Sequence, residues 1–91
     1  MYKLELEGYT PPINFTDLIY EGPDGNGWGG SFILFGISQS GYERLKSLFY
    51  NKQTVDCTIQ GDRHYYLRDA YFSDFVHIPS YQCRVTAGEI N

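Results

Sequence analysis

The sequence predicts an α+β domain that is mostly β, with antiparallel sheets forming a sandwich or partly closed barrel and one short flanking helix near residues 41–50. Several segments alternate apolar and polar residues with the period of two typical of half-buried strands, and one segment has helical periodicity. Aromatic residues, which favour strands, make up 18% of the chain. Because 91 residues can bury one core only, residues 1–91 are expected to form a single domain.

The first strand is predicted at the N-terminus. Residues 2–7 alternate apolar and charged side chains, and Gly8 ends the pattern. Pro11 and Pro12 cannot continue a hydrogen-bonded ladder, so a connector is expected there. Residues 14–21 fit either a strand or one loose helical turn, and we favour the strand.

A glycine-rich segment and a buried strand follow. Residues 21–30 include five glycines and are expected to form a flexible hairpin loop. Residues 25–30 have the GxGxxG spacing of dinucleotide-binding turns, but they precede a predicted strand instead of a helix, so a loop is the better interpretation. Residues 31–37 carry apolar side chains in both phases, which indicates a central strand covered on both sides.

Residues 41–50 are predicted to form the helix. Ser40 and Glu43 have the spacing of a capping box, in which a hydroxyl and a carboxylate satisfy free backbone N–H groups. Asn51 is expected to end the helix in a left-handed conformation. The apolar side chains share one helical face, which we expect to dock on a sheet: Tyr42, Leu45, Leu48 and Phe49.

The remaining segments are predicted to be strands. Residues 54–60 and 81–86 alternate, with Cys57 and Cys83 in the inward phase. Residues 63–75 are expected to form a long strand that bends, bulges or breaks. Strict alternation along it would place two sets of side chains on opposite faces: Tyr65, Leu67, Asp69 and Tyr71 on one, and Tyr66, Arg68, Ala70 and Phe72 on the other.

The residues that could support chemistry do not form a recognisable site. Cys57 and Cys83 lack the close spacing of zinc ligands and are expected to be buried thiols in a reducing compartment. His64 could pair with Cys57 or Asp62, but each pair lies near a predicted turn, where side chains are usually solvated. We therefore expect no enzyme, no catalytic residue, no metal site and no cofactor.

The charge balance limits the class of partner. Seven Lys and Arg against eleven Asp and Glu give a net charge of −4, which argues against direct binding of nucleic acid. The N-terminus has no basic region followed by an apolar run, so no secretory signal peptide is predicted. No segment approaches the roughly 18 apolar residues that a membrane helix needs. Other proteins are the expected partners.

Two groups of residues are candidates for a protein interface. Asn26 and Trp28 lie in the glycine-rich segment, and Trp is frequent at interface hot spots. In the long aromatic strand, either one face packs inside and the other meets a partner, or both faces are covered. The candidates on this strand are Tyr65, Tyr66, Arg68 and Tyr71.

The layout resembles the small structural proteins of bacteriophage tails and baseplates, of the tail-tube-like β-sandwich type. The similarity rests on the N-terminal strand, the glycine-rich loop, the buried strand, the capped helix and the aromatic strands that end in residues 85–90, Val-Thr-Ala-Gly-Glu-Ile. It implies a non-enzymatic virion component that forms homo-oligomers or rings, made in the bacterial cytoplasm and then built into the virion. Residues 21–30 would reach over a neighbouring subunit, and residues 41–50 would be the flanking helix.

A second function class competes with this one. A small acidic inhibitor, similar to phage-encoded anti-CRISPR proteins or the immunity proteins of toxin systems, would block a macromolecular target. The net charge of −4 suits capture of a basic site. Such an inhibitor is expected to be monomeric, whereas a ring component is expected to self-associate.

Overall fold

The computed structural model describes residues 1–23 and 29–91. It confirms the predicted class, because the chain is mostly antiparallel β-sheet with one short helix. In chain order the elements are β1 (Tyr2–Leu6), β2 (Ile13–Phe15), β3 (Asp17–Pro23), β4 (Gly30–Phe35), α1 (Gln39–Tyr50), β5 (Val55–Gln60), β6 (His64–Val76), β7 (Gln82–Ala87) and β8 (Glu89–Ile90).

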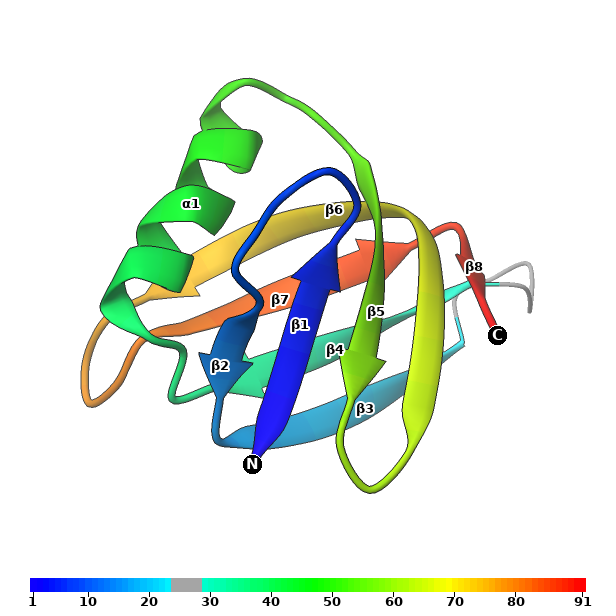
Figure 1. Cartoon of the computed structure of the whole chain (residues 1–91), viewed down its shortest axis with the longest axis horizontal. Helices are drawn as coiled ribbons and strands as arrows, with labels where there is room; N and C mark the ends of the chain where they lie inside the picture. The colour runs from blue at the N-terminus through cyan, green and yellow to red at the C-terminus, as the bar shows by residue number, and fades with distance from the viewer. Residues whose placement is uncertain (24–28) are drawn as a thin grey trace.

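The strands curl into a partly closed barrel with α1 beside it (Figure 1). They follow the order β2-β1-β5-β6-β7-β4-β3, with β8 added on β6. The first half of β6 pairs with β5 and β8, whereas its second half pairs mainly with β7. Across the barrel, Thr16 alone separates β2, which pairs with β1, from β3, which pairs with β4. The Thr16 N–H donates to the Phe35 carbonyl at 2.9 Å, which fixes this corner.

The long strand β6 bends as predicted, but its alternation changes at Asp69. Asp69 has a φ of 52°, and its N–H donates to Asp56 Oδ1 at 3.0 Å. One extra residue is thereby accommodated, which shifts the inward phase by one position. Leu67, Ala70 and Phe72 are all completely buried, so the expectation of strict alternation through residue 72 was wrong.

The barrel interior is a single apolar core. Its buried side chains come from α1 and from β1, β2, β4, β5, β6 and β7, and Leu18 of β3 packs against them. On β4 the phases differ from the expectation, because Gly30, Phe32 and Leu34 are buried and the positions that alternate with them are half-buried. β4 is therefore central in its sheet but covered fully on one face only. The largest side chains with less than 2% exposure are Leu4, Phe15, Phe32, Leu34, Leu45, Cys57, Ile59, Leu67, Phe72, Cys83 and Val85.

Helix α1 begins two residues earlier than predicted and uses a different cap. Ser38 is the N-cap, and its hydroxyl accepts the Gly41 N–H at 3.3 Å. The Ser38 N–H is itself bonded to the Asn14 carbonyl of β2 at 3.0 Å, so the helix entry is fixed there, and Ser40 falls inside the first turn. Asn51 has a φ of −86°, and the left-handed residue is Lys52, with a φ of 54°.

The helix packs against β6 and β2 through the predicted apolar face. Tyr42, Leu45 and Leu48 are buried, and the Phe49 ring lies 5.6 Å from the Phe75 ring. Gly41 lies against Ile13, where an added Cβ would collide. This close approach holds α1 over the end of the barrel and keeps β2 beneath it.

Candidate protein-binding surfaces

The residues predicted for an interface on β6 do not stay together. Tyr65 is half-buried and turns toward the core, where its ring centroid lies 5.0 Å from that of Phe32. Tyr66, Arg68 and Tyr71 lie outside, because the bulge at Asp69 brings Tyr71 into the outer phase. The sequence pattern placed Tyr71 on the same face as Tyr65, and that part of the prediction was wrong, because Tyr71 lies in the outer phase with Tyr66 and Arg68.

The two remaining candidates, Asn26 and Trp28, lie outside the described residues. The predicted reaching loop, residues 21–30, overlaps them. The structure shows that β3 continues to Pro23 and that β4 begins at Gly30. Part of the expected loop is thus strand.

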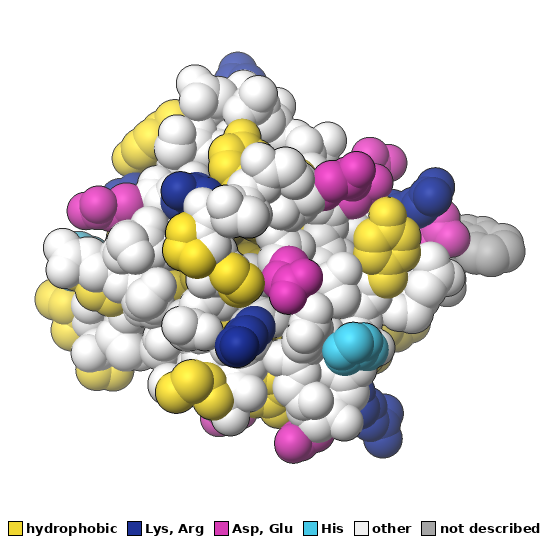
Figure 2. Space-filling view, viewed as in Figure 1, with side chains coloured by type: hydrophobic (Ala, Val, Ile, Leu, Met, Phe, Trp, Pro, Cys, Tyr) yellow, Lys and Arg dark blue, Asp and Glu magenta, His cyan; other side chains and the backbone are white. Residues whose placement is uncertain are grey.

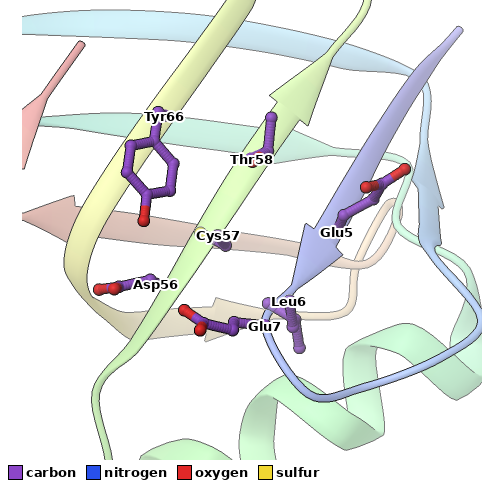
Figure 3. Close-up of a pocket in the computed structure, with 7 residues that line it drawn as sticks. All are labelled: Glu5, Leu6, Glu7, Asp56, Cys57, Thr58 and Tyr66. Carbon is purple, nitrogen blue, oxygen red and sulfur yellow. The ribbon is translucent and has the colours of Figure 1, made fainter.

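The outer face of β1, β5 and β6 carries a shallow cleft of about 290 Å³. Its rim includes Glu5, Glu7 and Asp56, and the Tyr66 ring stands over one side (Figure 3). Arg68 lies over the Tyr66 ring, with its guanidinium carbon 5.9 Å from the centroid. We call this surface the acidic cleft. Figure 2 shows that acidic and apolar side chains on this face are scattered among polar ones.

The outer face of β3, β4 and β7 is organised around Arg84. Its guanidinium binds both carboxylate oxygens of Glu21, at 2.7 and 3.1 Å, and also pairs with Asp74. The hydrogen bond from Arg84 lowers the pKa of the Glu21 carboxyl, and the same contact raises the pKa of Arg84. Ser31 donates a further bond to Glu21 at 3.0 Å. One positive charge is therefore shared between two carboxylates on this face.

Strand β3 ends one side of the sheet and pairs with β4 alone among the described strands. Two of its large apolar side chains are half-exposed, Ile19 at 50% and Tyr20 at 49%. A cleft of about 230 Å³ lies between β3 and the β5–β6 turn, lined in part by Leu18, Asp62 and Arg63. The turn therefore does not close over the strand. We call this surface the β3 edge.

The two cysteines are not available for nucleophilic chemistry in the folded chain. Burial raises the pKa of each thiol, Cys57 and Cys83, to about 12, so both are protonated at neutral pH. Cys57 faces the core and His64 is exposed in the outer phase of β6, so the sheet separates them. Within residues 1–23 and 29–91, no three His, Cys, Asp or Glu side chains lie close enough together to hold a metal ion.

Sequence reasoning missed the β3 edge and the Arg84 cluster. Residues 14–21 were ambiguous between strand and helix, so which side chains would be exposed could not be read from them. Arg84 and Glu21 are 63 positions apart, and no local pattern indicates that their strands lie in one sheet.

Comparison with known proteins adds no relative to this picture. No protein-family model matches the chain, and no curated protein or solved structure is significantly similar to it. Among the described helices, none is long and apolar enough to span a membrane.

Proposed function

We propose that this protein is a non-enzymatic structural or assembly protein that works through contacts with other protein subunits, as a component of a phage tail or baseplate. The observation that carries the proposal is the β3 edge, where the terminal strand pairs with β4 alone among the described strands and presents Ile19 and Tyr20 to solvent. An exposed strand edge with large apolar side chains is a template for pairing with another chain.

The architecture supports the same proposal. The described part of the chain forms a small antiparallel barrel with one helix at its side, which is the layout that the resemblance to tail and baseplate proteins implies. In this function the protein uses no cofactor, and its partners are other subunits, including further copies of itself. It is made in the bacterial cytoplasm and then assembled into the virion.

Self-association provides the test. The native molar mass is measured by light scattering after size exclusion over a concentration series, and concentrated samples are examined by electron microscopy. A dimer, trimer, hexamer or larger closed species supports the proposal. A strict monomer at millimolar concentration contradicts homo-assembly.

The acidic cleft favours one alternative, a small inhibitor that captures a basic site. Glu5 of β1 and Glu7, which follows β1, line this cleft together with Tyr66 (Figure 3), and neither forms an ion pair with any described residue. Carboxylates grouped with a tyrosine suit contact with a cationic polypeptide.

This alternative predicts a salt-sensitive interaction with a positively charged ligand. Calorimetric titration with a lysine-rich peptide should show binding that weakens in the double variant Glu5→Gln, Glu7→Gln. Glu43→Gln, on the exposed face of α1, is the control for loss of one carboxylate elsewhere. Equal binding by all three proteins would remove the argument for the acidic cleft.

A further inference from the structure

The two terminal strands of the sheet, β2 and β3, differ in how their outer edges are covered. The β2 edge is closed, because the Asn14 carbonyl accepts the Ser38 N–H and because α1 packs over Ile13. β3 has no corresponding cover in the described chain, and the cleft beside it separates it from the β5–β6 turn. Within residues 1–23 and 29–91, one terminal strand is therefore covered and the other is open.

The exposed side chains of β3 lie on both sides of its sheet. Ile19 pairs with Ile33 on the outer face, whereas Tyr20 pairs with Phe32, and the two rings lie 5.0 Å apart on the core side. A partner resting on the outer face would cover Ile19 only. A strand added at the edge would lie beside both Ile19 and Tyr20, so the exposure pattern fits strand addition.

The charges on β3 permit this strand to meet a copy of itself. Strand β3 carries two carboxylates, Asp17 and Glu21. Arg84 forms an ion pair with Glu21, whereas Asp17 forms no ion pair with any described residue. In an antiparallel pair centred on Ile19, Asp17 would face Glu21 of the other copy, which is unfavourable. Registers centred on Leu18 or Tyr20 avoid that opposition.

Asp17 also shows how the edge is satisfied in the single chain. The Leu18 N–H donates to the carboxylate of its neighbour Asp17 at 2.8 Å. If another strand pairs with β3, one of its carbonyl groups can replace the Asp17 carboxylate as the acceptor of this N–H. Asp17 thus competes with strand addition, both by charge and by occupying a donor.

We propose that β3 pairs antiparallel with β3 of a second copy, which joins the β7-β4-β3 sheets of two molecules into one continuous sheet. The inference rests on the proposed function, since it names the contact through which the protein self-associates. The resulting two-fold dimer is closed at β3 and can serve as the unit of a larger assembly through other surfaces.

The experiment compares three single variants with the unchanged protein. Ile19→Lys puts a charge beside the new strand, whereas Ile78→Lys makes the same substitution at a side chain that is 73% exposed in the turn after β6. Asp17→Ala removes the competing carboxylate. Molar mass is measured over a concentration series, circular dichroism checks the fold, and amide hydrogen exchange is followed at low and high concentration.

We expect Ile19→Lys to weaken dimerisation by about tenfold or more, Ile78→Lys to leave it unchanged, and Asp17→Ala to strengthen it by about tenfold. Amide exchange should slow with concentration within β3. Because an unfolded variant can aggregate, the Asp17→Ala result counts only as a discrete dimer of a variant whose circular dichroism matches that of the original protein.

The outcomes separate the two proposals. If Ile19→Lys self-associates as strongly as the original protein and amide exchange within β3 does not change with concentration, β3 pairing is overturned while the assembly function stands. Loss of association in Ile78→Lys instead would place the contact at another surface. A monomer at every concentration overturns β3 pairing and homo-assembly together, and binding of β3 only to a foreign peptide would also overturn the proposal.

Discussion

Replacing Leu45 with alanine tests how α1 is attached to the barrel. Leu45 is completely buried, and its helix is held against both β6 and β2, so the surroundings have little freedom to collapse into the space left behind. Large-to-small substitutions in cores cost about 2–5 kcal/mol, and this confinement favours the upper half of that range, about 3.5–5 kcal/mol. Leucine and alanine are both strong helix formers, so helix propensity contributes little to the loss.

The expected loss is large for a domain of this size. At about 0.05–0.15 kcal/mol per residue, a chain of 91 residues has an unfolding free energy of about 5–14 kcal/mol. Urea unfolding followed by circular dichroism should show a lower midpoint for Leu45→Ala with an unchanged slope. Ser47→Ala, on the exposed side of the same helix, should stay within about 0.5 kcal/mol of the original protein. A loss below about 1 kcal/mol for Leu45→Ala would refute the docking of α1 through this residue.

Three other properties of the structure can be measured independently. At Asp69, whose φ is 52°, Asp69→Val should cost about 1–2 kcal/mol or more in thermal or urea unfolding while Asp69→Gly is tolerated; equal stability would contradict the bulge. Because burial raises the pKa of Cys57 and Cys83 to about 12, against an ordinary value of 9.0, their contribution to stability is complete below pH 9 and is lost as the pH rises toward 12. The double alanine variant should therefore lose less stability between pH 9 and 11 than the original protein, and a parallel pH dependence would argue against burial of the thiols. Arg84→Gln should raise the pKa of Glu21 toward its ordinary value in a carbon NMR titration, and an unmoved titration would show that the pair does not form in solution.

The sequence predicts the strands well where one face is exposed to solvent and the other is buried. The alternation in residues 2–7 and 54–60 placed Leu4 and Ile59 inside, and both are fully buried. The helical face was also correct, since Leu45 and Leu48 are buried. In these segments burial is decided by a local period, which the sequence displays directly.

Local patterns were insufficient where hydrogen bonds between distant segments determine the start of a helix or the phase of a strand. The helix is capped by Ser38 because Asn14, from another strand, fixes the chain there, and the capping-box spacing at Ser40 carries no information about that bond. The grouping of Tyr65 with Tyr71 failed for a similar reason, since the phase change depends on Asp56 accepting the Asp69 N–H. The open edge of β3 follows from strand order, which short-range patterns do not specify.

The phase change at Asp69 has a consequence for how this segment tolerates altered length. Asp69 is the extra residue of β6 between Leu67, which pairs with Cys57 of β5, and Ala70, which pairs with Val55, and the pairing with β7 begins at Tyr71. It therefore separates two stretches of β6 whose inward and outward positions differ by one residue. Deleting it would restore regular alternation but turn Ala70 and Phe72 out of the core or force the earlier half of β6 to turn over. Strand β6 therefore cannot lose the residue that makes its corner without losing the inward placement of one of its halves.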